Sequence, residues 1–299
     1  MKFTDYLAKV LKEKKIKSVF GLQGGAVVHI FDSIEKEKIE VIYMHHEESV
    51  GLAAVSFSKI NDVPGCAVVT SGPGSTNAIT GLLAGWQDSI PTIFISGQAR
   101  SDQLSYNKKV RQTGTQEVNI IDIVKPICKY AVCLSKPNDL PGELNKAFKI
   151  ATSGRPGPVW IDIPVNLQWE EIKPKKFELE KKFIDHKINK SYERAFQLLK
   201  NSKKPVFVLG YGLRLSNQQN RLVKFLEKYK FPYVTTWTAS DISSTNSYLN
   251  MGIIGMCGQR GANKIIFESD LLICLGTHLS VPHTTGLFES YAPNAKKII

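Results

Sequence analysis

Two neighbouring acids, Glu47 and Glu48, stand at the start of a run of small apolar residues in the segment MHHEESVGLAAVSFSKI. The spacing of those apolar residues predicts a helix, and a negative charge at a helix N-terminus is favoured by the helix dipole. This structural role accounts for one of the two acids, Glu48, which we expect near the solvent or the helix cap. A carboxyl group shielded by apolar neighbours has a raised pKa and can hold a proton near neutral pH. We therefore expect Glu47 to exchange a proton with a bound heterocycle.

Three glycine-bearing turns follow apolar runs in the first half of the chain: FGLQGGA (20–26), TSGPGSTNA (70–78) and ISGQARSDQ (95–103). Ligands of parallel α/β sheets bind beyond the carboxyl ends of the strands, where such turns fall. We expect the three turns at one rim of a sheet, together with Glu47. Each turn taken alone could equally serve to close a tight strand-to-helix connection.

The second of these turns has the most particular sequence. Its Gly72-Pro73-Gly74 bend opens a predicted helix, because proline favours the first helical turn, and the polar residues that follow can cap the helix or meet a ligand. Phosphate-loop, dinucleotide-binding, serine-hydrolase and zinc-hydrolase motifs are all missing from the sequence. His45 and His46 adjoin Glu47, but neighbours on an extended segment point opposite ways, so at most one of them joins the site.

Short β-branched runs alternate with helical patterns along the whole chain, beginning at residues 18, 41, 65, 92 and 158, and again at 205, 231 and 270. Strands that are apolar on both faces and separated by helix-length segments predict parallel sheets covered on both sides. We therefore expect an α/β fold with two doubly wound, mainly parallel-sheet domains. Residues 291–299 read as the opening of another strand, so we expect a fragment or a shortened chain.

The composition restricts the classes of partner. With 299 residues, 42% of them hydrophobic, the chain can bury a substantial core, and its formal charge is +12. Many lysines are dispersed, and the basic connector 173–190 alternates acids with bases, which favours a solvated linker over a nucleic-acid surface. The five cysteines include no C-x-x-C pair, and no stretch of about 18 successive apolar residues occurs. We expect a cytoplasmic protein that binds neither nucleic acid nor membranes.

Five segments, in this order, closely resemble the pyrimidine-binding domain of thiamine-diphosphate enzymes of the acetolactate synthase group: VFGLQGGAVVHIFDSI, MHHEESVGLAAVSFSK, VVTSGPGSTNAITGLLAGWQDSIPTIFISGQ, RQTGTQEVNIIDIVKPICKYA and GRPGPVWIDIPVN. The later segments PVFVLGYG, MGIIGMCG and SDLLICLGTHLS resemble the family's middle, Rossmann-like domain. The resemblance implies a pyrimidine-binding domain at 1–172, a charged linker at 173–190 and an incomplete middle domain at 191–299. The family's diphosphate-binding domain is absent.

The resemblance implies a role for each matching residue. In this family a glutamate hydrogen-bonds a ring nitrogen of the aminopyrimidine and favours its imino tautomer, and Glu47 occupies that place as the catalytic residue. The cofactor then attacks a 2-keto acid, for which we expect pyruvate, releases carbon dioxide and passes the acyl unit to an acceptor. The other implied cofactor-binding residues are Gly25 and Ala26 near the reacting carbon, Pro73, Gly74 and Asn77 along the pyrimidine, and Gln116, which approaches from the neighbouring subunit's side.

Departures from the family leave the acceptor open. Gln23 replaces a usual proline, Thr115 replaces a phenylalanine, and IPVN at Ile163 lacks the lysine that often follows its proline. We expect acetolactate synthase-like chemistry first, with a second keto acid as the acceptor; a keto-sugar nucleotide is the alternative, and the turn GTHLSVPHTTG resembles relatives that use one. FAD stays open as a second cofactor, because the aspartate and arginine of flavin-binding relatives are not visible.

The resemblance also implies what this chain lacks. The family anchors Mg²⁺ and diphosphate through a G-D-G motif and a later asparagine, neither of which is present, so we expect no metal ligands here, weak cofactor binding and no turnover by the chain alone. A dimer would be the smallest active unit, and we expect a homodimer or tetramer. A non-catalytic subunit that keeps the fold to pair with a full-length partner is the alternative from a different class.

Overall fold

A computed structural model of the protein describes residues 1–299 except 62, 106–108, 174–189 and 287. The chain divides into two compact units, Met1–Lys181 and Lys182–Ile299. The point of division falls in the undescribed segment 174–189, as does most of the predicted linker at 173–190. The bounds of that linker therefore stay a prediction, and each unit is described by itself.

The first unit is built on one parallel sheet of six strands. Their order is β2-β1-β3-β4-β6-β5, and every neighbouring pair is parallel. β3, β4 and β6 are buried along their whole length, which is why their sequences are apolar runs without alternation. The strands are β1 Ser18–Gly21, β2 Glu40–Tyr43, β3 Gly65–Val69, β4 Thr92–Gln98, β5 Tyr130–Cys133 and β6 Val159–Pro164.

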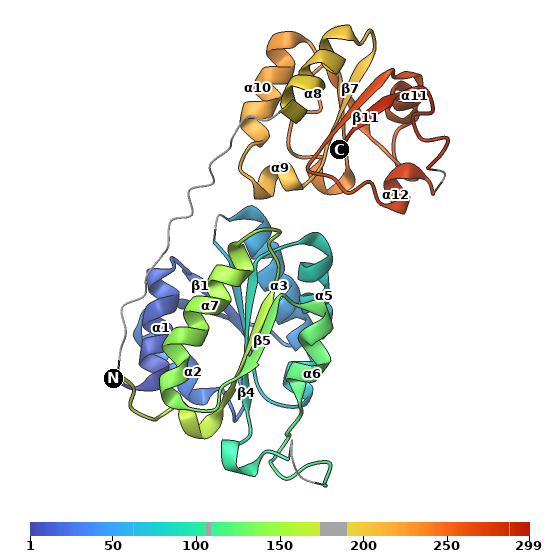
Figure 1. Cartoon of the computed structure of the whole chain (residues 1–299). Coiled ribbons are helices and arrows are strands. Elements are labelled where there is room, and N and C mark those ends of the chain that lie inside the picture. Colours follow the sequence, from blue (N-terminus) through green and yellow to red (C-terminus); the bar gives the residue numbers. More distant parts are fainter. Residues whose placement is uncertain (62, 106–108, 174–189, 287) are drawn as a thin grey trace. The chain divides into compact units, whose positions relative to one another are not determined.

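Helices cover both faces of this sheet. Figure 1 shows α1, α2 and α7 on one side and α3, α5 and α6 on the other. The apolar residues of α1, α2 and α7 form a single core with the facing side chains of the strands, because their apolar positions recur at helical spacing. The helices are α1 Phe3–Glu13, α2 Val28–Lys36, α3 Glu47–Ile60, α4 Pro73–Asn77, α5 Ile79–Asp88, α6 Ile120–Val124 and α7 Leu140–Thr152, with 3₁₀ turns η1 Ser101–Gln103, η2 Lys125–Ile127, η3 Pro137–Asp139 and η4 Val165–Leu167.

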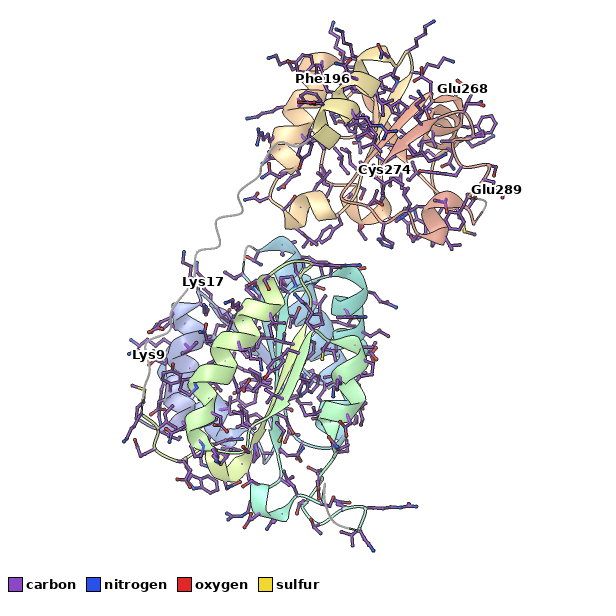
Figure 2. All side chains as sticks on the ribbon, viewed as in Figure 1. Lys9, Lys17, Phe196, Glu268, Cys274 and Glu289 are labelled. Carbon is purple, nitrogen blue, oxygen red and sulfur yellow. The ribbon has the colours of Figure 1, made fainter. Side chains whose placement is uncertain are left out.

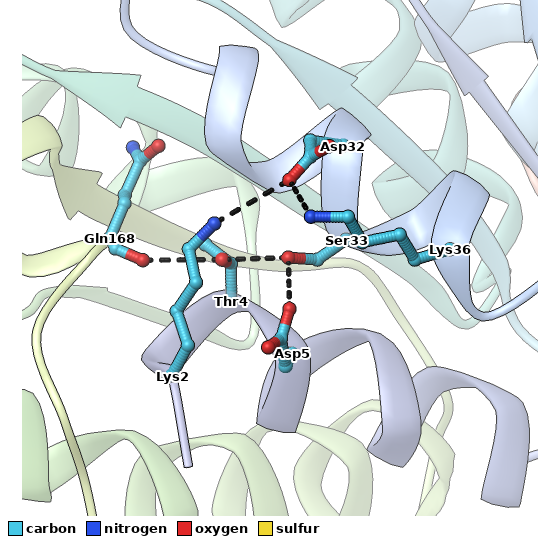
Figure 3. Close-up of polar contacts among 7 residues, drawn as sticks. All are labelled: Lys2, Thr4, Asp5, Asp32, Ser33, Lys36 and Gln168. Atoms are coloured by element: carbon cyan, nitrogen blue, oxygen red, sulfur yellow. Dashed lines mark hydrogen bonds and ion pairs between the residues drawn. The ribbon is translucent and has the colours of Figure 1, made fainter.

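A buried polar chain joins the beginning of this unit to its end (Figure 3). Ser33 of α2 donates to Thr4 of α1 at 2.8 Å, and Thr4 donates to the backbone carbonyl of Gln168 at 3.2 Å. Beside them, the backbone N–H of Phe3 donates to the carbonyl of Glu170 at 2.9 Å. Residues 168–172 are therefore part of the first unit, packed against its first helix.

The second unit has a parallel sheet of five strands in the order β11-β10-β7-β8-β9. One apolar cluster joins α8 and α10 to one face of the sheet, and another joins α11 to the opposite face. The elements are α8 Lys190–Asn201, β7 Pro205–Leu209, α9 Gly212–Leu215, α10 Gln219–Tyr229, β8 Tyr233–Thr235, η5 Trp237–Ala239, β9 Asn250–Ile253, α11 Arg260–Glu268, β10 Leu271–Leu275, α12 Val281–Thr284 and β11 Lys296–Ile298.

The expected fold class is confirmed: both units are α/β, with parallel sheets covered by helices on both faces. The strand expected near the end of the chain is β11, which pairs with β10. Lys9 and Lys17 lie on the outside of the first unit and Cys274 inside the second (Figure 2). None of the five cysteines, all of which are described, forms a disulfide. Among the described residues, we find no helix with the length and apolar character needed to cross a membrane.

Candidate functional site

The three glycine-bearing turns meet at one edge of the first sheet, as expected from the sequence. They follow β1, β3 and β4, which are neighbours in the sheet and run parallel, so their carboxyl ends lie at the same rim. The turn after β1 crosses directly over β4: a Cβ built at Gly97 would overlap the backbone of Ala26. Only glycine at that position lets the first turn pass so close to β4.

Thr70, at the end of β3, stands between the first two turns. Its hydroxyl accepts a hydrogen bond from the backbone N–H of Ala26 at 3.2 Å. Its methyl group fills the space that side chains at Gly24 and Gly74 would need, since a Cβ at those positions would lie 2.6 and 2.7 Å from Thr70 Cγ2. Thr70 therefore sets the spacing of the two turns, a role that the sequence analysis did not assign.

Glu47 begins α3 and reaches the second turn. Asn77 Nδ2 donates a hydrogen bond to Glu47 Oε2 at 3.0 Å, and a Cβ at Gly74 would lie 3.4 Å from Glu47 Oε1. Glu47 is half-buried in this chain, so the apolar shielding expected from the sequence is partial. Two other predicted residues of the site, Asn77 and Gly74, thus lie beside the Glu47 carboxylate.

Of the two histidines beside Glu47, one caps a helix and the other is exposed. His46 is the N-cap of α3, and its Nδ1 accepts a hydrogen bond from the backbone N–H of Glu48 at 3.2 Å. His45 is exposed. The cap was not predicted, because histidine is not among the residues that usually cap helices.

The remaining residues of the second turn support its bend. Gly72 has φ +63°, a conformation that other residues adopt only at a cost, and Pro73 follows at the start of α4. Ser75 Oγ donates to the carbonyl of Gly72 at 2.9 Å, and Thr76 Oγ1 donates to that of Pro73 at 3.2 Å. These two hydroxyls therefore bond within the turn, and Asn77 alone of the three polar residues reaches Glu47.

Gly25 and Ala26, on the first turn, differ in their surroundings. The backbone of Ala26 is held at both ends, by Thr70 and by Gln168, whose Nε2 donates to the Ala26 carbonyl at 2.7 Å. No heavy atom lies within 4 Å of the position of a Cβ at Gly25, apart from its neighbours in the chain. The first turn therefore combines a fixed backbone with an open side at Gly25.

Gln116 lies against the second turn within the same chain. Its backbone oxygen would be 2.6 Å from a Cβ at Gly72, and its own φ is +52°. The side chain of Gln116 is exposed. All seven predicted site residues thus lie at this rim, on or beside the first and second turns.

A buried carboxyl group under the rim was missed by the sequence analysis. Asp162 in β6 is fully buried, and it accepts hydrogen bonds from Ser96 Oγ at 2.5 Å and from Gln98 Nε2 at 2.8 Å. Burial raises the pKa of Asp162 to about 7, although these two bonds and one from Cys133 lower it. The available signal was an acid inside an otherwise apolar strand, WIDIP.

The residues at the rim fit the edge of an aminopyrimidine ring. Such an edge presents nitrogen atoms that donate and accept, and the rim offers a carboxylate acceptor at Glu47 and an amide at Asn77, beside backbone left bare by Gly74. In the described part of the chain, no group of three or more His, Cys, Asp or Glu residues could hold a metal ion. The expectation that Mg²⁺ ligands lie elsewhere, and the open question of FAD, stay predictions.

Comparisons with known proteins agree with this site. Residues 1–123 match the profile of the thiamine pyrophosphate enzyme N-terminal TPP binding domain, and residues 192–299 match that of the central domain; thiamine pyrophosphate is another name for thiamine diphosphate. The chain is 33% identical to the acetolactate synthase large subunits of Haemophilus influenzae and Corynebacterium glutamicum and to isozyme 1 of Escherichia coli.

Each alignment covers 98% of this chain and 51%, 46% and 51% of the respective relative. The chain thus spans about half the length of the curated relatives it matches. The two profile matches together cover most of the chain and follow the order of the two structural units. The chain therefore belongs to the thiamine pyrophosphate enzymes, whose N-terminal and central domains it contains.

Proposed function

We propose that this chain is the cofactor-activating part of a carboligase that decarboxylates a 2-keto acid, with pyruvate as the donor, and that its chemistry is like that of the acetolactate synthases it resembles. The observation that carries the proposal is the position of Glu47, at the start of α3 and in contact with Asn77 of the second turn. A carboxylate held in place at a rim of glycine turns can exchange a proton with a ring nitrogen that binds beside it.

The residues of the rim divide the work. Asn77 orients Glu47 through Oε2, which directs the other oxygen, Oε1, toward Gly74 and the ring edge. Glu47 Oε1 then holds or releases the proton shared with the ring nitrogen. When bound, thiamine diphosphate supplies the carbon nucleophile that attacks the keto acid. Gly25 leaves room for the reacting groups, and Thr70 keeps the two turns at a fixed spacing.

We further propose that Mg²⁺ and the diphosphate are held by residues outside this chain, so that the chain alone binds the cofactor weakly and does not turn over. The active assembly would contain at least two subunits, in a homodimer or a tetramer. A reducing compartment such as the cytoplasm fits a chain whose five cysteines form no disulfide.

For the acceptor, we propose a second keto acid, with a keto-sugar nucleotide as the alternative. Gln23, which departs from the family, donates to the hydroxyl of Tyr43 at 2.8 Å, and Tyr43 donates to Glu35 at 2.8 Å. The Gln23 side chain is thus engaged with β2 and α2. Because the Gln23 side chain is already hydrogen-bonded to Tyr43, we propose that the acceptor does not use Gln23 as a ligand.

Titration of the chain with thiamine diphosphate and Mg²⁺, followed by calorimetry, tests the prediction that the chain alone binds the cofactor weakly. Tight binding would refute it.

Turnover is measured in a complete assembly, made by fusing the chain to the remainder of the Haemophilus influenzae large subunit. Products from ¹³C-labelled pyruvate, with and without a keto-sugar nucleotide, identify the acceptor. We expect Glu47→Gln to lower turnover at least about 100-fold with folding intact, and Glu48→Gln, one residue away, to retain it. Unchanged turnover in Glu47→Gln would contradict the role proposed for Glu47.

A further inference from the structure

The segment between β4 and α6 carries Gln116, and the side-chain carboxylate of Glu117 accepts hydrogen bonds from several residues of this segment. Glu117 Oε1 accepts hydrogen bonds from the backbone N–H and, at 2.7 Å, from the hydroxyl of Ser105. Glu117 Oε2 accepts from the backbone N–H groups of Thr113 at 2.9 Å and Gly114 at 3.0 Å. Residues eight and nine positions apart, 105 and 113–114, are therefore fixed to the side chain that follows Gln116.

Gln116 itself adopts a conformation that must be imposed by its surroundings. Its φ of +52° lies in the left-handed region, which costs a residue with a side chain about 1 kcal/mol. Its carbonyl oxygen is packed against Gly72, where any Cβ would lie 2.6 Å away. The Gln116 side chain is exposed, so its own packing does not enforce this conformation. The neighbouring carboxylate closes the loop around it, together with the hydroxyl of Thr113, which donates to the carbonyl of Gln103, and with Gln98, which donates to the carbonyl of Val118.

The ionisation of Glu117 agrees with this arrangement. Partial burial raises its pKa, but hydrogen bonds from Thr113, Ser105 and Gly114 outweigh burial and lower the pKa to about 2. Because the pKa in the folded chain lies below its ordinary value, the stabilisation is present above about pH 4 and is lost as the pH falls toward 2. Glu117 is therefore charged, with both oxygens occupied by donors of its own loop, and is not placed to act as an acid or base.

We propose that Glu117 is a positioning residue for Gln116: its carboxylate draws Ser105, Thr113 and Gly114 together and so holds Gln116 beside Gly72. This inference rests on the proposed function, for which the family resemblance implies that Gln116 approaches the cofactor and substrate. The role of Glu117 is to fix the loop before any ligand binds, which spares the ligand the cost of ordering it.

Hydrogen exchange of the full chain tests the positioning role without any ligand. In Glu117→Gln we expect the amides of residues 109–119 to lose at least about tenfold in protection, since a glutamine turns an NH₂ group toward N–H donors. Glu13→Gln, at an exposed acid of α1 in the same unit, is the control and should keep the wild-type pattern. Helices α3 and α5 should be unaffected. Wild-type exchange in Glu117→Gln overturns the proposal, and so does a loss of protection spread over the whole unit.

A double-mutant cycle tests the connection with Gln116. The binding of thiamine diphosphate with Mg²⁺ is measured by calorimetry for the wild type, Glu117→Gln, Gln116→Ala and the double variant. We expect the double variant to bind no more weakly than Gln116→Ala, because Glu117 acts through Gln116. Losses that multiply would overturn the proposal. Binding too weak to measure in the wild-type chain agrees with the proposed function, and the positioning role is then decided by the exchange result alone.

Discussion

At the scale of single residues, two carboxyl groups of the first unit show how surroundings divide their roles. Glu47 is half-buried and lies at the rim, where a ligand can reach it, whereas Asp162 is fully buried beneath the rim. Gln98 connects Asp162 to the loop that carries Gln116, because its Nε2 also donates to the carbonyl of Val118 at 2.8 Å. A buried acid thus supports the site from below without facing it.

The raised pKa of Asp162 makes the stability of the first unit depend on pH, with a known sign. Its pKa in the folded chain is raised to about 7, mainly by burial, so its contribution to stability is complete below about pH 4 and is lost as the pH rises through 7. Asp162→Asn removes this titration. We expect the free energy of unfolding of the wild type, relative to the variant, to fall by about 4 kcal/mol between pH 4 and pH 8.

Urea unfolding across that pH range measures the difference. Glu13→Gln, at an exposed position of the same unit, controls for the removal of one negative charge. A difference between wild type and Asp162→Asn that stays constant with pH would show that Asp162 does not titrate in this range.

The residues of the site were predictable to different degrees. Glu47 stands in a short motif, so the local sequence was sufficient to name it, whereas Asn77 was one of three polar residues of the second turn and was singled out by the family resemblance. Thr70, Asp162 and Gln168 act through partners on other strands and turns, and Gln168 lies 142 positions from Ala26, which it holds. No local pattern contains such a partner, so these roles needed the assembled sheet.

At the scale of the elements, the two glycine turns depend on one side chain between them. We expect Gly74→Ala to destabilise the first unit by about 1–3 kcal/mol, because the added methyl would meet Thr70 Cγ2 at 2.7 Å. Thr70→Ser removes Cγ2 and retains the hydroxyl that accepts from Ala26. Thr70→Ser should therefore rescue most of the loss in Gly74→Ala.

Gly24→Ala is the matched comparison for this rescue. A Cβ there would meet the Cβ of Thr70 most closely, an atom that serine also possesses. Thr70→Ser should rescue Gly24→Ala much less than Gly74→Ala, as measured by urea unfolding in a double-mutant cycle. Equal rescue of the two variants would contradict the packing described at Thr70.

The start of α3 provides a second test, because His46 caps the helix that presents Glu47. His46→Ala should lower the free energy of unfolding by about 1 kcal/mol, since the N–H of Glu48 loses its acceptor. His46→Asn should restore it, because asparagine is a good N-cap. Thermal unfolding of the three proteins measures the effect. A deficit that persists in His46→Asn would show that the imidazole has a role other than capping.

Two strands that the sequence analysis did not identify, β5 and β9, share features that weaken the strand pattern in the sequence. β5 and β9 are four residues long and only half-buried; β9, NMGI, lacks the continuous apolar run of the central strands, and β5, YAVC, is apolar but contains a single β-branched residue. β5 is an edge strand, and β9 is the edge of the second sheet. Edge strands have one neighbour and need less apolar surface, which leaves a weaker pattern in the sequence.

At the scale of the whole molecule, the chain has two units with separate cores. In the first, Phe94 is fully buried and stacks on Trp160, with ring centroids 5.2 Å apart. In the second, Phe207 is buried and packs against Phe231, at 5.5 Å. Each phenylalanine belongs to the core of its own unit, so its removal reports on that unit.

We expect the two units to unfold as separate cooperative transitions. Phe94→Ala should lower the stability of the first unit by about 3–5 kcal/mol, and Phe207→Ala should do the same to the second, because each leaves a cavity in its core. Hydrogen exchange in increasing urea, followed in peptides from β4 and from β7, assigns each transition to its unit in the full chain. Each variant should shift one transition and leave the other in place. A shift of both transitions by either variant would mean that the units fold as one, and the cofactor-binding unit could then not be treated separately from the central domain.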